Sequence, residues 1–123
     1  MSNINAGQLV AEGKTKKILA TDTPGLVVIE SKDDLTAGDG AKHDIIRGKA
    51  SLSNRTTSNV FRLLRACGLP VAFIKEVDNT KFFAEQCDMI PYEVVVRREA
   101  HGSFLKRYPW LPKGHIFSRL LVW

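Results

Sequence analysis

Residues 49–70 read KASLSNRTTSNVFRLLRACGLP and predict the longest helix of the chain. Apolar residues recur at helical spacing over roughly residues 49–67. The apolar positions are Leu52, Val60, Phe61, Leu64 and Cys67. Gly68 favours a left-handed C-terminal cap, and Pro70 prevents the helix from continuing. The pattern therefore predicts one well-bounded helix that can cover a sheet.

Short runs of strand-like sequence lie on both sides of this helix. The β-branched run Leu26–Glu30 (LVVIE) predicts a buried strand. The other predicted elements are strands at Leu9–Glu12, Lys17–Thr21, Val71–Glu76, Lys81–Cys87, Glu93–Arg98 and Ile116–Trp123, and a short helix at Ser103–Tyr108. Residues 33–40 are rich in Asp, Thr and Gly and predict a loop. Together they predict an α+β fold, a largely antiparallel sheet with one long helix packed on a face.

Length and composition predict one soluble domain over residues 1–123. The 123 residues are 44% hydrophobic and 25% charged, as is ordinary for a globular domain. No run approaches the roughly 18 apolar residues of a membrane helix, and the N-terminus has no secretory signal pattern. Cys67 and Cys87 stand alone, which favours free thiols. We expect a cytoplasmic protein without a membrane partner.

The net charge of +5 is concentrated at the C-terminal end. Residues 97–123 hold six Lys or Arg against Glu99 alone, whereas residues 1–96 are neutral. A local basic field suits a phosphorylated ligand. Nucleic acid is a weaker prediction, because the segment lacks interleaved aromatic residues and matches no known nucleic-acid-binding signature.

The segment Glu12–Lys17 (EGKTKK) lies between two predicted strands. A glycine there lets backbone N–H groups approach phosphate oxygens, and lysines add positive charge. The segment is not a Walker A motif, because the spacing and the following helix are missing. An exposed hairpin turn with solvated lysines explains the same residues, and on this motif alone it is the stronger interpretation.

Two further segments have the residue types of a binding site. Asp33–Lys42 (DDLTAGDGAK) suits a metal, an amine or a ribose, and an ordinary polar loop explains it equally well. In Glu93–Ser103 (EVVVRREAHGS), Arg97 ends a predicted strand and Ser103 begins a predicted helix. Arginine and a helix N-terminus both bind phosphate. A capping serine and a surface arginine would give the same pattern, but the basic C-terminal region favours anion binding.

In their order along the chain, these segments resemble the SAICAR synthetase family, the phosphoribosylaminoimidazole-succinocarboxamide synthases. The matching stretches are Glu12–Lys16, Lys32–Asp34, Thr36–Gly40, Gly48-Lys49, and Pro91–Ser103 followed by Lys106-Arg107. Pro91–Ser103 is the most distinctive of them, and the resemblance covers nearly the whole chain. It implies the N-terminal ATP- and ribonucleotide-binding domain of that family.

The resemblance implies a purine-biosynthesis ligase, which condenses carboxyaminoimidazole ribonucleotide with L-aspartate using ATP and Mg²⁺. Lysines of the glycine turn would bind ATP phosphates, a backbone hinge would meet adenine, and an arginine and a serine would hold the ribonucleotide's 5′-phosphate. The residues so implied are Gly13, Lys14, Lys16, Asp88 and Met89 for ATP, and Asp39, Arg97 and Ser103 for the ribonucleotide. No side chain is implied as a catalytic nucleophile.

Length is the main departure from the family. Its members carry a C-terminal domain with an Asp-x-Lys-x-Glu-Phe-Gly-like segment that supplies metal ligands, and this sequence has no such segment. We therefore expect an incomplete enzyme with weak or no activity alone, and Mg²⁺ ligands in the C-terminal part. An uncovered sheet would favour a homo-oligomer. The alternatives are a non-catalytic nucleotide- or phosphate-binding module and, well behind, a basic RNA-binding domain.

Overall fold

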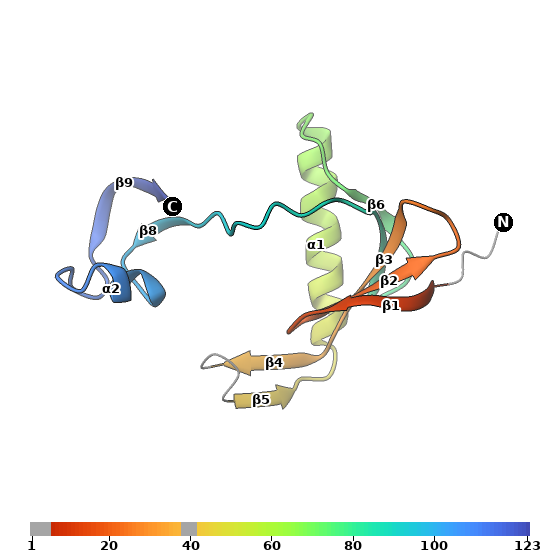
Figure 1. Cartoon of the computed structure of the whole chain (residues 1–123), viewed down its shortest axis with the longest axis horizontal. Coiled ribbons are helices and arrows are strands. Elements are labelled where there is room, and N and C mark those ends of the chain that lie inside the picture. Colours follow the sequence, from red (N-terminus) through yellow and green to blue (C-terminus); the bar gives the residue numbers. More distant parts are fainter. Residues whose placement is uncertain (1–5, 38–41) are drawn as a thin grey trace. The chain divides into compact units, whose positions relative to one another are not determined.

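A computed structural model describes residues 6–37 and 42–123, and its elements are labelled in Figure 1. The strands are Ala6–Glu12 (β1), Lys16–Thr21 (β2), Leu26–Ser31 (β3), Asp34–Ala37 (β4), Lys42–Ile45 (β5), Phe73–Glu76 (β6), Lys81–Glu85 (β7), Val96–Glu99 (β8) and Ile116–Val122 (β9); the helices are Lys49–Ala66 (α1) and Ser103–Arg107 (α2). The chain divides into two compact units, Met1–Asp88 and Met89–Trp123. The single domain expected over residues 1–123 stays a prediction.

The first unit is built on a five-stranded antiparallel sheet in the order β1-β2-β3-β7-β6. Helix α1 packs on one face of it against β3, β6 and β7 (Figure 1). The buried cluster between them contains Val27, Phe73, Phe82 and Ala84. Phe61 of α1 stacks on Phe73 with ring centroids 5.7 Å apart. Apolar burial between one helix and one sheet thus stabilises this unit, and the predicted α+β class is confirmed.

Helix α1 begins and ends close to where the sequence predicts. At its start, Gly48 has a φ of 86° and the Asp33 carboxylate accepts the Ala50 N–H at 2.8 Å. A carboxylate at this end also opposes the positive end of the helix dipole. At the other end, Gly68 has a φ of 80°. Its N–H donates to the Arg65 carbonyl, and the Leu69 N–H donates to the Leu64 carbonyl. This is the left-handed glycine cap that the sequence predicts.

The buried face of α1 differs from the predicted one. Leu52 is 71% exposed, and Val60 and Cys67 are exposed as well. The residues fully or nearly buried are Ala50, Asn54 and Ser58, spaced four apart. Small side chains let the helix lie close to the sheet, and Asn54 donates to the Asp78 carbonyl at 3.1 Å. An apolar pattern cannot detect a stripe of small and polar residues. The prediction was therefore wrong for Leu52, Val60 and Cys67, whereas Phe61 packs against the core as its spacing indicated.

The loop predicted at residues 33–40 is replaced in part by a hairpin. Strand β4 pairs antiparallel with β5, with Asp34 opposite Ile45 and Thr36 opposite His43. Aspartate is rare in strands whereas threonine is common there, and the partner strand satisfies the backbone groups of both. Gly38, Asp39 and Gly40, between the two strands, lie outside the described residues.

The second unit consists of the antiparallel pair β8–β9 and the short helix α2. Its centre is Phe104 of α2, only 4% exposed, whose ring meets Phe117 and Trp123 edge-on at centroid distances of 5.6 and 5.4 Å. The strand expected from Glu93 starts only at Val96. No helix in the described part of the chain is long and apolar enough to cross a membrane.

Candidate functional site

The segment around Gly13 forms the tight connection between β1 and β2. The Gly13 N–H donates to the Lys16 carbonyl at 2.9 Å, and the Lys32 N–H donates to the Thr15 carbonyl at 2.8 Å. The first bond closes the turn, and the second ties it to the end of β3. We call residues 13–16 the Gly13 turn. Because both bonds are made by backbone groups, the turn side chains are free to contact a ligand.

The two lysines of the Gly13 turn carry uncompensated charge. Lys14 is exposed and Lys16 half-buried, and neither forms an ion pair with any residue that the structure describes. A Cβ built on Gly13 would lie 3.9 Å from the nearest atom, the Lys16 carbonyl oxygen. The fold itself therefore tolerates a side chain at Gly13. Any need for glycine there must come from a ligand that approaches the backbone.

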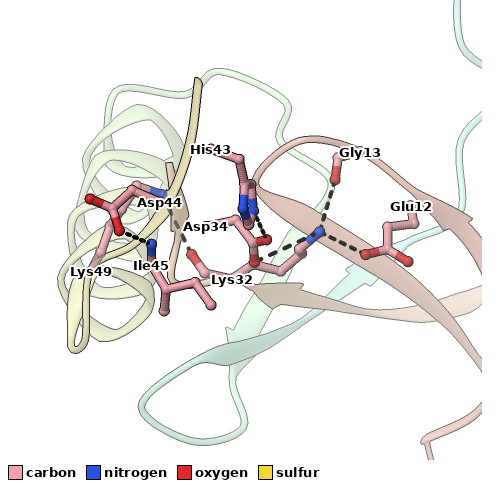
Figure 2. Close-up of polar contacts among 8 residues, drawn as sticks. All are labelled: Glu12, Gly13, Lys32, Asp34, His43, Asp44, Ile45 and Lys49. Atoms are coloured by element: carbon pink, nitrogen blue, oxygen red, sulfur yellow. Dashed lines mark hydrogen bonds and ion pairs between the residues drawn. The ribbon is translucent and has the colours of Figure 1, made fainter. Parts of the chain in front are cut away.

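A polar cluster lies directly behind this turn (Figure 2). Lys32 Nζ is 2.7 Å from Glu12 Oε1 and 3.8 Å from Asp34 Oδ2, and His43 Nε2 is 2.7 Å from Asp34 Oδ1. The hydrogen bond between Lys32 and Glu12 raises the pKa of Lys32 and lowers the pKa of Glu12. His43 lowers the pKa of Asp34. Lys32 was not among the predicted site residues, although it lies in one of the family-like stretches.

In the second unit, Arg97 is held in a fixed orientation by its neighbours. Its guanidinium carbon lies 5.3 Å from the Phe104 ring centroid and 5.4 Å from that of Trp123, and its Nη1 donates to the His101 carbonyl. Arg97 Nε is buried without a hydrogen-bond partner in the part of the chain that the structure describes. Stacked and only partly paired, Arg97 keeps donors for an anion. This aromatic support was not predicted from the sequence.

Ser103 is the first residue of α2, as predicted, but it is not the cap of this helix. The N-cap is Gly102, whose φ of 57° and ψ of −133° suit glycine, and no side chain makes a capping hydrogen bond there. Helix α2 has only five residues, so its dipole contributes little to anion binding. The Ser103 hydroxyl remains a candidate donor by virtue of its exposure.

The remaining predicted site residues are less constrained by the structure. Asp88 is exposed and Met89 is 86% exposed, and they lie in an irregular segment after β7. Asp39 lies outside the described residues. Within the described ranges 6–37 and 42–123, no group of three or more His, Cys, Asp or Glu residues could hold a metal ion. The described residues therefore offer two separate anion-facing groups, the Gly13 turn and Arg97.

Known proteins share both the sequence and the fold of this chain. Residues 9–122 match the SAICAR synthetase family. A mouse bifunctional phosphoribosylaminoimidazole carboxylase/phosphoribosylaminoimidazole succinocarboxamide synthetase is 48% identical over 115 residues, which are 93% of this chain and 27% of that protein. The phosphoribosylaminoimidazole-succinocarboxamide synthase of Ehrlichia chaffeensis superposes with a TM-score of 0.84 at 32% identity, over 94% of this chain and 48% of that one.

A solved SAICAR synthetase in complex with ADP is also similar. It is 38% identical, with a TM-score of 0.80 over 91% of this chain and 47% of that one. The chain thus spans about half the length of the solved relatives, and about a quarter of the bifunctional mouse protein. Because the family match extends over almost all of its residues, the chain belongs to the SAICAR synthetase family.

Proposed function

We propose that this chain is the ATP- and ribonucleotide-binding part of a phosphoribosylaminoimidazole-succinocarboxamide synthase. That enzyme condenses carboxyaminoimidazole ribonucleotide with L-aspartate and converts ATP to ADP and phosphate. The observation that carries the proposal is the Gly13 turn, with two lysines that make no ion pair to described residues. The chain also belongs to a family in which a 38% identical relative was solved in complex with ADP.

The ATP phosphates of this proposal bind at the Gly13 turn of the first unit. Lys14 and Lys16 would neutralise the phosphates as mobile point charges, which suits a flexible polyphosphate. Gly13 would let a phosphate oxygen come close to the backbone. The backbone at Asp88 and Met89 would meet the adenine edge, and its exposure leaves those groups accessible.

The ribonucleotide site uses Arg97, with Ser103 as a second donor to the 5′-phosphate and Asp39 facing the ribose or imidazole. The support is the position of the Arg97 guanidinium over the rings of Phe104 and Trp123 and its unpartnered Nε among the described residues. A guanidinium held in this way can bind a phosphate with little loss of conformational entropy. The assignment of Arg97 rests on the family resemblance and on this geometry, and those of Ser103 and Asp39 rest on the resemblance alone.

The chemistry requires charge stabilisation more than a side-chain nucleophile. ATP would phosphorylate the carboxylate of the ribonucleotide, and the aspartate amine would then attack the carbonyl carbon and release phosphate. Cations that hold the phosphates stabilise the charge that develops in both steps. Mg²⁺ would assist this charge stabilisation. The described residues contain no group of three or more His, Cys, Asp or Glu residues for a metal ion, and we assign no Mg²⁺ ligand among them.

Calorimetric titration of the purified chain tests the two binding sites separately. ATP with Mg²⁺ should bind the wild-type chain and Arg97→Ala equally and bind Lys14→Ala at least about tenfold more weakly, as loss of a charged contact predicts. The imidazole ribonucleotide should show the reverse pattern. Absence of binding of both ligands to the wild-type chain would refute the proposal.

Product formation separates a ligase from a non-catalytic module. The chain is mixed with ATP, Mg²⁺, the ribonucleotide and L-aspartate, and SAICAR is measured by chromatography. Formation of SAICAR that is lost in Arg97→Ala would establish the ligase activity for the chain itself. Binding of both ligands without any product would favour a non-catalytic binding module, or a site completed by residues outside this sequence.

A further inference from the structure

Among the lysines near the Gly13 turn, Lys32 differs from Lys14 and Lys16 in its exposure and its ion pairing. Its side chain is only 17% exposed, whereas Lys14 belongs to the exposed residues. It is paired with carboxylates on two sides, Glu12 at 2.7 Å and Asp34 at 3.8 Å. A paired and largely covered ammonium is poorly suited to bind phosphate directly. Its role must lie in what it does to the residues around it.

Lys32 holds the Gly13 turn through its backbone and its side chain together. Its N–H donates to the Thr15 carbonyl at 2.8 Å. Its ammonium bonds Glu12 and also lies 3.4 Å from the Gly13 carbonyl oxygen, a longer and weaker contact (Figure 2). Because Glu12 and Gly13 are at one end of the turn and Thr15 is at the other, this one residue fixes both ends.

Lys32 also cancels negative charge beside the turn. Without its ammonium, the Glu12 and Asp34 carboxylates would face a polyphosphate as like charges, which oppose binding. Glu12 is adjacent in sequence to Gly13, and Asp34 is paired on its other side with His43 at 2.7 Å. The cluster in Figure 2 thus has alternating charges, carboxylate, ammonium and carboxylate, beside Gly13.

We propose that Lys32 is a positioning residue for the Gly13 turn, which fixes the turn's backbone and neutralises Glu12 and Asp34 so that Lys14 and Lys16 bind a polyphosphate. The inference rests on the proposed ATP site and adds to it a residue that does not touch the nucleotide. The effect of Lys32 should therefore grow with the number of phosphates on the ligand. A residue that merely stabilises the fold would weaken all nucleotides alike.

Nucleotide titrations of Lys32→Met test the charge part of this inference. ATP affinity should fall at least about tenfold, ADP affinity less, and AMP affinity hardly at all, because each phosphate adds charge near the carboxylates. Lys32→Arg should recover most of the loss. Lys75→Met removes the same charge from an exposed position on β6 and should bind ATP like the wild type.

The double variant Glu12→Gln/Lys32→Met sharpens the test. If charge cancellation is the role of Lys32, removal of Glu12's charge should restore at least half of the lost ATP affinity on a logarithmic scale. Equal losses for ATP, ADP and AMP, or unchanged binding of all three to Lys32→Met, would overturn the inference. The Arg and double variants keep the test decisive even where Lys32→Met does not fold.

Amide hydrogen exchange tests the positioning part without any nucleotide. In Lys32→Met, the Gly13 amide, bonded to the Lys16 carbonyl, should exchange several-fold faster, while amides in the middle of α1 keep their rates. Unchanged exchange at Gly13 would overturn the positioning role. Because this measurement needs no ligand, it distinguishes failure of the Lys32 inference from failure of the ATP site itself, which would appear as no ATP binding to the wild type.

Discussion

The two anion-facing regions of this chain present their cations in different ways. In the Gly13 turn, Lys14 and Lys16 form no ion pair with the described residues, and the neighbouring Lys32 pairs with the nearby carboxylates. In the second unit, the Arg97 guanidinium lies over the rings of Phe104 and Trp123 and donates to a carbonyl. A flexible chain of phosphates suits mobile point charges, whereas a single phosphate suits one oriented guanidinium. The difference indicates two ligands with different geometry.

The conservative exchange of arginine for lysine should have its largest effect at Arg97. Arg97→Lys removes the planar fork and the stacking on both rings, so we expect ribonucleotide affinity to fall about thirtyfold. The same titration with ATP serves as the control and should be unchanged. Wild-type affinity for the ribonucleotide would mean that Arg97 acts as a simple point charge, and the contrast with the turn would disappear.

Removal of one aromatic ring should have a smaller effect at the same site. Trp123→Leu takes away one of the two rings over Arg97, and the loss of a cation–π contact predicts about fivefold weaker ribonucleotide binding. Trp110→Leu is the matched control, because Trp110 is exposed and no cation–π contact to it is found in the described residues. If both variants bind equally well, the stacking does not orient Arg97.

Acid should weaken the first unit through its paired carboxylates. Three carboxylates have a lowered pKa because each accepts a hydrogen bond from a basic side chain. Lys32 lowers the pKa of Glu12, His43 lowers that of Asp34, and Arg62 lowers that of Glu76. A lowered folded-state pKa gives stability that is complete above the unfolded value, near 4.5 for glutamate, and that is lost as the pH falls through the folded value. Denaturant unfolding should therefore show a falling free energy of unfolding below about pH 4.5.

The variant Glu76→Gln provides the control for this pH dependence. Its free energy of unfolding should fall less between pH 4.5 and more acid conditions, because one titrating carboxylate is gone. The effect is small, since Glu76 and Arg62 form a surface ion pair with side chains 31% and 50% exposed. An identical pH profile for the variant and the wild type would contradict the contribution of this pair.

The smallest effects are expected where the Gly13 turn tolerates change. Lys14→Arg keeps a mobile cation and should change ATP affinity by no more than about twofold, in contrast to the exchange at Arg97. Gly13→Ala should alter the free energy of unfolding by less than about 0.5 kcal/mol, because a Cβ there meets nothing closer than 3.9 Å. A clear loss of ATP affinity in that variant, with stability unchanged, would show that the ligand approaches the backbone.

The sequence was most informative where structure depends on near neighbours. The bounds of α1 and its glycine cap follow from residues within a few positions of each end, and the predicted helix and observed helix nearly coincide. The β-branched run at Leu26 gave the central strand β3 for the same reason. The family resemblance, carried by residues 91–103 above all, indicated the fold class before any coordinates.

Local reasoning failed where a distant partner determines the outcome. The polar run at Asp34–Ala37 becomes a strand only because β5 supplies its hydrogen bonds. The buried stripe of Ala50, Asn54 and Ser58 reflects the close approach of the helix to the sheet. No local sequence pattern predicts the pairing of Lys32 with Glu12 or the contact of Arg97 with aromatic rings.

The chain's residue order was thus enough to specify its helix, most of its strands and the positions of its candidate cations. Those features depend on backbone preferences and periodicity, which act over a few residues. The pairing of Lys32 with Glu12, 20 residues apart in the chain, and the contact of Arg97 with Trp123 exist only in the folded chain. Long-range packing sets the charge and geometry that a ligand meets, because burial and ion pairing exist only once the segments have come together.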